Sequence, residues 1–102
     1  MNNDKEYLVT LNVPPGLEEA VVDNLLVLES EHGFSSYIVN SHDHKNEGLS
    51  LLEQVTGRQK KIRFQLYMPA QGLPVLLEQL RHEFSGSGIH YRVTPVIDSG
   101  TI

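Results

Sequence analysis

The side chains best suited to chemistry are gathered in one stretch, HDHKNEGLSLLEQVTGRQKK, which runs from His42 to Lys61. Its first three residues, His42, Asp43 and His44, offer two imidazoles and a carboxylate. In an extended segment, histidines at positions i and i+2 project to the same side, a spacing that can chelate zinc, copper or nickel. These three residues are therefore candidate metal ligands. The alternative is a polar loop that water covers.

The same stretch ends in a basic cluster that continues into the next segment and holds half of the chain's eight lysines and arginines. Arginine binds a phosphate or carboxylate through two parallel hydrogen bonds. A neighbouring glycine lets the backbone turn beside it. The candidate anion ligands are Gly57, Arg58, Lys61 and Arg63. The alternative is a solvated strand start whose charges pair with an acidic surface.

A second candidate for anion binding is the sequence SGSG, residues 85–88. Backbone N–H groups around Gly86 and Gly88 can form a nest that holds an anion, although most such turns only reverse the chain. Neither pattern identifies a particular ligand or cofactor, so the effector and any cofactor are unknown at this stage.

Between the histidines and the basic cluster lie four aliphatic residues, Leu49, Leu51, Leu52 and Val55. Ser50 and Glu53 have the spacing of a capping box, which predicts a turn of helix. So short a helix is not stable in water by itself. The aliphatic side chains would therefore dock on a neighbouring subunit or a partner protein, or complete the core of their own domain.

None of these residues forms a catalytic arrangement. Ser41, His42 and Asp43 are adjacent in sequence, and adjacent residues rarely reach the geometry of a catalytic triad. The chain also lacks a nucleophile elbow, paired buried carboxylates and a phosphate-binding loop. We expect the protein not to be an enzyme.

Composition narrows the class further. The 102 residues predict a single domain, 1–102. A net charge of −5 disfavours a nucleic-acid partner, and the absence of cysteine excludes disulfides and thiolate metal sites. No apolar run approaches the ~20 residues of a membrane span, and the sequence MNNDKEYLV lacks the regions of a signal peptide. We expect a cytoplasmic protein that does not insert into a membrane.

The elements that must position these residues follow from hydrophobic periodicity. Alternation predicts strands over 7–13, 34–40, 60–68 and 89–97. Helical spacing predicts one helix from Leu17 to about His32–Gly33 and another from Leu73 to Phe84. The predicted apolar faces of the helices are Leu17, Ala20, Val21, Leu25 and Leu28, and Leu73, Leu76, Leu77, Leu80 and Phe84. Right-handed crossovers then give an α+β, ferredoxin-like β-α-β-β-α-β sandwich, with two helices on one face of a four-stranded antiparallel sheet.

The other face of the sheet, here called the open face, is predicted to be basic and partly apolar. Its residues are Leu8, Thr10, Asn12, Ser35, Tyr37, Val39, Lys61, Arg63, Gln65, Tyr67, His90, Arg92, Thr94 and Val96, with Glu6 as an acid at its fringe. This segregation favours burial between copies of the chain, as in a cyclic oligomer. The alternative is ordinary exposed apolar surface. The third strand presents a single tyrosine, which is not the aromatic pattern of an RNA-binding sheet.

The element order, the long central connection and two segments together resemble the PII-like superfamily. The segments are EQVTGRQKKIRFQLYMP (53–69) and LPVLLEQLRHEFSGSGIHYRVTPV (73–96). Within that superfamily, the sequence resembles a small, uncharacterised bacterial branch, and this resemblance implies an association with metal efflux. The resemblance implies a homotrimer with inward-facing sheets, clefts for a small effector, often an adenine nucleotide, and a T-loop at about 41–59 that contacts a partner protein.

The sequence departs from the PII pattern at two points. Ile89 follows SGSG, so the aspartate and lysine of the PII motif T-G-x-x-G-D-G-K are absent. No tyrosine lies between Tyr37 and Tyr67, so the uridylylated T-loop tyrosine of some PII proteins has no counterpart. ATP binding of the PII kind and this covalent regulation are therefore disfavoured.

Three functional hypotheses remain open. The first is a non-enzymatic, PII-like trimeric sensor in metal homeostasis, whose central loop contacts a partner protein; connections longer than ~12–15 residues are usually functional or disordered. The second is a direct divalent-metal-binding protein of the CutA kind. The third is a small-ligand-binding regulatory domain of the ACT type.

Overall fold

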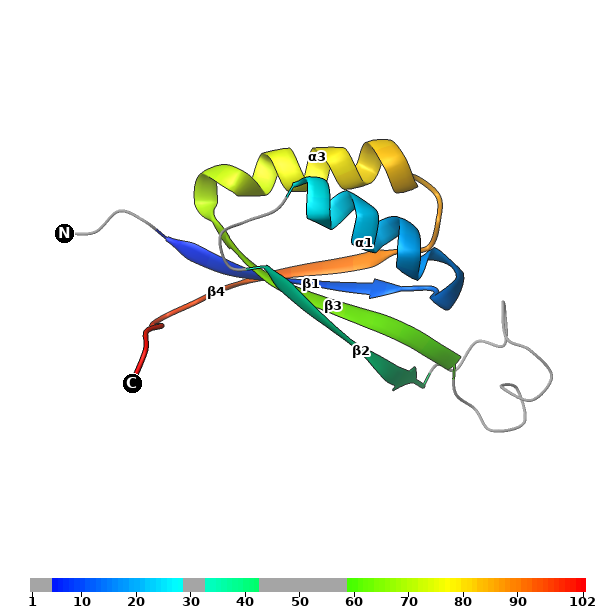
Figure 1. Ribbon diagram of the computed structural model, residues 1–102, viewed down its shortest axis with the longest axis horizontal. Coiled ribbons are helices and arrows are strands. Elements are labelled where there is room, and N and C mark those ends of the chain that lie inside the picture. Colours follow the sequence, from blue (N-terminus) through cyan, green and yellow to red (C-terminus); the bar gives the residue numbers. More distant parts are fainter. Residues whose placement is uncertain (1–4, 29–32, 43–58) are drawn as a thin grey trace.

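The computed structural model describes residues 5–28, 33–42 and 59–102. In chain order the elements are β1 (Glu6–Val13), η1 (Pro15–Leu17), α1 (Glu18–Val27), β2 (Phe34–Ser41), β3 (Gln59–Pro69), η2 (Ala70–Gly72), α3 (Leu73–Phe84) and β4 (His90–Pro95). The strands pair antiparallel in the order β2-β3-β1-β4. Both helices lie on one face of the sheet (Figure 1). The predicted α+β, ferredoxin-like fold is confirmed.

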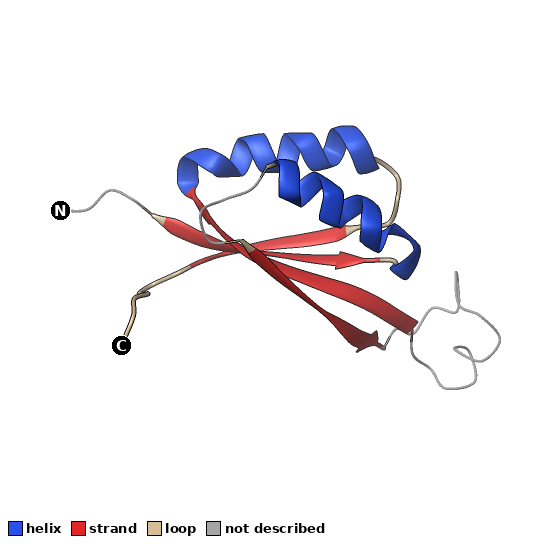
Figure 2. Cartoon of the chain, viewed as in Figure 1, coloured by secondary structure: helices blue, strands red, loops and turns tan. Residues whose placement is uncertain are grey.

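The core lies between the helices and the two central strands (Figure 2). Alternation along β1 turns Val9, Leu11 and Val13 toward the helices, where each is completely buried. On β3 the predicted inward residues Ile62, Phe64, Leu66 and Met68 are likewise buried. β1 and β3 are the two central strands of the sheet, and these inward side chains pack against the residues of the helix layer.

Each helix covers this core with a narrow stripe of apolar side chains. Val21 and Leu25 are the buried residues of α1, and Leu76 and Leu80 those of α3. Ala20, which was predicted on the apolar face of the first helix, is instead exposed. On the other side of the buried stripe of α1 from Ala20, the half-buried Val22 packs against the core instead.

Two predicted boundaries were wrong. The helix α1 ends at Val27 rather than near His32–Gly33. Its last turn holds no basic residue that would offset the negative end of the helix dipole.

The last strand, β4, ends at Pro95 rather than at Ile97. Proline cannot donate a ladder hydrogen bond, and its position on an edge strand agrees with that limit. A single further bond, from the N–H of Val96 to the carbonyl of Glu6 (2.9 Å), closes the pairing of β4 with β1. None of the helices in the described ranges is long and apolar enough to span a membrane.

The edge strand β2 is only partly covered by the helix layer. Ile38 pairs with the buried Ile62 and lies on the same face, yet 67% of its surface is exposed. Figure 1 shows the ends of β2 and β3 extending beyond the helices. This part of the sheet therefore presents apolar surface on both faces, since Tyr37 on the open face is also exposed.

Candidate functional site

The register of the strands assembles the open face in rows that run across the sheet. In the central row, Tyr37 lies beside Arg63, Arg63 beside Asn12, and Asn12 beside His90. The next row consists of Ser35, Gln65, Thr10 and Arg92, and the row beyond it of Tyr67, Leu8 and Thr94. The pairing thus joins residues that sequence alternation could only assign to a common face.

A hydrogen bond fixes the centre of the open face. The Nε–H of Arg63 donates to Oδ1 of Asn12 at 2.8 Å, and the pair is partly buried. A bond from a charged donor is stronger than a neutral one, and this one ties the guanidinium of β3 to the neighbouring strand. Arg63 therefore presents a positive charge in a defined position on the face rather than at the end of a freely moving side chain.

The charges of the open face have one dominant sign. Lys61, Arg63 and Arg92 are its basic residues. Among the residues of the four strands, Glu6 is the acidic residue on this face. On the helix layer an exposed hollow is lined by Glu18, Glu19, Val22 and Asp23. The predicted segregation of basic and acidic residues to opposite sides is therefore present in the fold.

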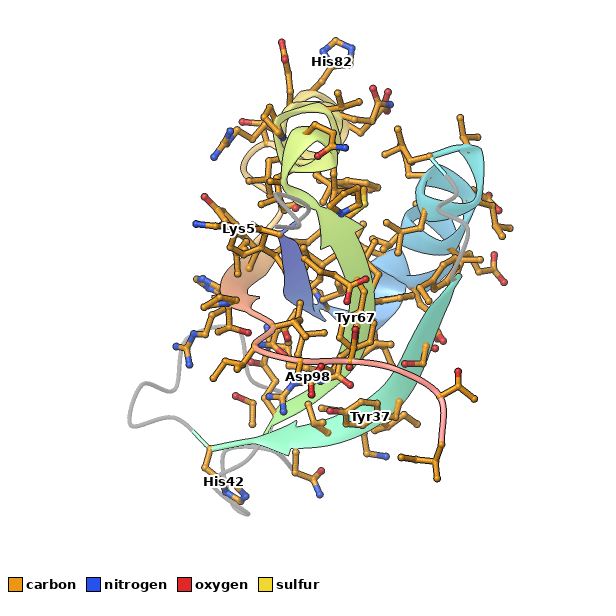
Figure 3. All side chains as sticks on the ribbon, turned by 90° about the vertical axis from the view of Figure 1, so that its left-hand side faces the viewer. Lys5, Tyr37, His42, Tyr67, His82 and Asp98 are labelled. Atoms are coloured by element: carbon orange, nitrogen blue, oxygen red, sulfur yellow. The ribbon has the colours of Figure 1, made fainter. Side chains whose placement is uncertain are left out.

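Apolar side chains surround the charged centre. Tyr37 and Tyr67 are 44% and 45% exposed, and Leu8 and Val39 are half-buried. Figure 3 shows Tyr37 on the side of the sheet away from the helices, whereas His82 projects from the helix layer. A surface that combines exposed aromatic rings with ordered positive charge is suited to a protein interface or to an anionic ligand.

The glycine-rich turn after α3 lies at the same end of the sheet as the start of β3. Gly88 comes two residues before His90, which shares its row with Arg63. An ideal Cβ on Gly88 would lie 3.9 Å from Cγ of Pro14, the residue that follows β1. The anion-binding candidates Lys61, Arg63, Gly86 and Gly88 are thus brought to one end of the fold.

Chain reversal accounts for Gly86 without a ligand. The N–H of Ser87 donates to the carbonyl of Phe84 at 3.0 Å. Ser85 has φ −58° and ψ 130°, and Gly86 has φ 78°. These angles define a type II turn, whose third position requires a positive φ and therefore favours glycine.

A hollow that the sequence analysis did not anticipate lies between α3 and β4. It has a volume of about 240 Å³ and is lined mainly by apolar side chains, including Leu80, Phe84 and Ile89. At its rim, Nη2 of Arg81 donates to the hydroxyl of Tyr91 at 3.0 Å, and the guanidinium carbon lies 5.8 Å from the centre of the tyrosine ring. Alternation does predict Tyr91 on the helix side of β4, but only the packing of α3 brings Arg81 beside it.

Of the remaining predicted site residues, His42 is the one that lies within the described ranges. His42 is exposed and directly follows β2, whose last residue, Ser41, pairs with Gln59. Asp43, His44, Leu49, Leu51, Leu52, Val55, Gly57 and Arg58 lie outside the described residues. Among the described residues, no three His, Asp or Glu side chains are grouped so that they could hold a metal ion.

Comparison with protein families and solved structures identifies relatives of the chain. A family model described as "Protein of unknown function (DUF3240)" matches residues 4–102. A search of the curated proteins finds no match. The crystal structure of a DUF3240 family protein from Shewanella baltica is similar over 100% of this chain and 99% of that one, with a TM-score of 0.76 and 22% identity.

Two further similar structures belong to named groups. CPII, a nitrogen regulatory PII-like protein from Thiomonas intermedia that was solved with ADP, AMP and bicarbonate, has a TM-score of 0.63 and 16% identity, with 97% of each chain covered. CutA from Synechococcus elongatus has a TM-score of 0.65 and 12% identity, with 94% of this chain and 80% of that chain covered. At such identities the likeness establishes the fold, which is PII-like, and leaves function to the site.

Proposed function

This chain belongs to the DUF3240 family, and from that premise we propose that it is a non-enzymatic, PII-like regulatory protein that assembles as a homotrimer. Residues 1–102 then form one domain, and the open faces of three copies meet around an axis. The observation that supports assembly most directly is the mixed character of the open face, where Tyr37 and Tyr67 remain almost half exposed beside the bonded Arg63–Asn12 pair. Burial between copies removes this apolar surface from water.

Light scattering during size-exclusion chromatography tests the assembly. The expected mass is three times the 11.5 kDa of one chain. Tyr67→Lys adds a positive charge to a face that already carries Lys61, Arg63 and Arg92, and it is expected to lower the measured mass because like charges repel where the faces of different copies meet. Val75→Lys is the matched control, because Val75 is 60% exposed on the helix layer. A wild-type monomer at micromolar concentration, or equal masses for both variants, would contradict the homotrimer.

The central connection, residues 41–59, is proposed to contact a partner protein through Leu49, Leu51, Leu52 and Val55. In support, the two ends of the connection are paired in the sheet, since Ser41 lies opposite Gln59. The connection therefore starts from a fixed base at one end of the fold. Proteins that co-purify with the wild type are expected not to co-purify with the Leu51→Asp/Leu52→Asp variant. The mass of the assembly is expected to be the same in both. An unchanged set of co-purified proteins would refute this role.

A small anionic effector is proposed to bind at the same end of the sheet. Lys61 and Arg63 lie on β3 there, with the turn of Gly86 and Gly88 nearby, and Gly57 and Arg58 precede β3 in the sequence. A thermal-shift screen of nucleotides, amino acids and inorganic anions tests this, because a ligand that binds only the folded state raises its stability. An anion is expected to raise the melting temperature of the wild type, and this rise is expected to be absent in Arg63→Gln. Stabilisation by an amino acid that does not depend on Arg63 would favour the ACT-type alternative.

Metal homeostasis is the proposed setting, and direct metal binding of the CutA kind is the second candidate function. Two observations favour it. The fold is similar to that of CutA from Synechococcus elongatus, and His42 is exposed directly after β2. Calorimetry with zinc, copper and nickel on wild type and on His42→Ala/His44→Ala separates the two functions. A heat of metal binding that is present in the wild type and absent in the double variant supports direct binding. Identical calorimetric traces for the two proteins would exclude direct binding by these histidines.

A further inference from the structure

The segment that follows β4, residues 96–102, lies on the side of the sheet away from the helices (Figure 1). This segment is called the arm. Its base is attached at two points to Glu6, because the N–H of Val96 donates to the carbonyl of Glu6 (2.9 Å) and the hydroxyl of Ser99 donates to Oε1 (3.2 Å). The arm therefore leaves the sheet in a defined direction, next to the row that contains Leu8 and Tyr67.

The arm carries two large apolar side chains that its own protomer does not cover. Ile97 is 99% exposed, and Ile102 is exposed to the full extent of a free residue (121%). Single exposed apolar residues are normal on protein surfaces. Here, however, both isoleucines lie within seven residues on a segment that is hydrogen-bonded at its base.

We propose that the arm of one protomer packs on the open face of a second copy of this chain. The chemistry of the two surfaces is complementary. The arm offers isoleucine and the carboxylate of Asp98, and the open face offers exposed tyrosine rings among lysine and arginine. Figure 3 shows Asp98 and Tyr37 on the same side of the sheet, the side on which the copies would meet. The three residues beyond the bonded Ser99 can extend by ~10 Å, which is about the distance between two packed sheets.

This inference rests on the proposed assembly and adds a specific contact to it. In an assembly held by the open faces alone, the arm would contribute nothing. With the arm in place, each open face is completed by residues of another copy, and Asp98 brings a negative charge to a face on which Lys61, Arg63 and Arg92 are gathered. Opposite charges across an interface also fix the orientation in which two copies dock.

Disulfide trapping between different single-cysteine variants tests the contact, because the chain has no cysteine of its own. Ile102→Cys is refolded together with ¹⁵N-labelled Tyr37→Cys, Tyr67→Cys or Val75→Cys and then oxidised mildly with oxidised glutathione. Mass spectrometry identifies pairs that join a labelled to an unlabelled chain. Such pairs are expected with Tyr37→Cys or Tyr67→Cys on the open face and not with Val75→Cys on α3. Absence of pairs with both tyrosine sites, or equal pairing with Val75→Cys, would overturn the proposal.

A dissociation measurement gives an independent test. Ile97→Ser/Ile102→Ser is expected to dissociate at a protomer concentration at least tenfold above that of wild type, as followed by light scattering on dilution. Val27→Ser is the control, because Val27 is 84% exposed on α1, away from the open face. An assembly that forms in wild type and dissociates identically in the double variant would overturn the arm contact while leaving the homotrimer intact. A monomeric wild type would overturn both.

Discussion

The substitution Gly86→Ala tests whether the turn after α3 is held by its backbone geometry. Gly86 has φ 78° as the third residue of a type II turn. An ideal Cβ at this position would meet no atom within 4 Å, so steric contact contributes nothing. The cost of the alanine is then the cost of a left-handed backbone in an L-residue, roughly 1–2 kcal/mol of unfolding free energy.

Urea unfolding at a fixed protomer concentration measures this change, because the stability of an oligomer depends on concentration. Gly16→Ala is the matched control. Gly16 does not have a positive φ, and its ideal Cβ also meets no atom within 4 Å. At such a compatible position, alanine reduces the freedom of the unfolded chain and is expected to stabilise by about 0.4–1 kcal/mol. The two glycine substitutions should therefore have opposite signs.

A third variant identifies the cause. Asparagine tolerates the left-handed region better than alanine, so Gly86→Asn is expected to retain part of the stability that Gly86→Ala loses. If Gly86→Ala unfolds at the same urea concentration as wild type with an unchanged slope, the positive φ of Gly86 is not required and the turn argument is wrong. Equal losses for alanine and asparagine would show that the side chain itself, rather than the backbone angle, is the cause.

Three further substitutions probe the core and the open face, each by urea unfolding. Phe64→Ala removes a completely buried ring from the core and should destabilise by about 3–5 kcal/mol; a loss below about 1 kcal/mol would refute that burial. Asn12→Ala removes the acceptor of the Arg63 Nε–H and should cost about 1 kcal/mol, with no loss expected when Arg63→Ala is already present. The Oγ of Ser87 is buried and has no hydrogen-bond partner in the described part of the chain, so Ser87→Ala should be neutral or stabilising. A clear loss of stability in Ser87→Ala would reveal a partner of that hydroxyl.

Much of the fold was predictable because its determinants are local. Alternation along β3 placed Ile62 and Phe64 inward and Arg63 outward, and the structure confirms each position. The predictions failed where local preference was weak. The C-terminal end of α1 was predicted from the Gly33 stop signal, whereas the helix ends at Val27, in a last turn without basic residues. For the site, the sequence predicted which residues lie on the open face, but it did not predict which of them are neighbours across the strands.

The sequence by itself determined which residues face the core and which face away, because alternation and helical spacing depend only on the geometry of the backbone. Only the tertiary structure decided that Arg63 bonds Asn12, 51 positions away, and that Arg81 lies against Tyr91 at the rim of a hollow. The exposure of Ile97 and Ile102 was decided in the same way. Such contacts depend on strand register and on how the helices pack across the sheet. Those are relations between distant segments, which no local pattern encodes.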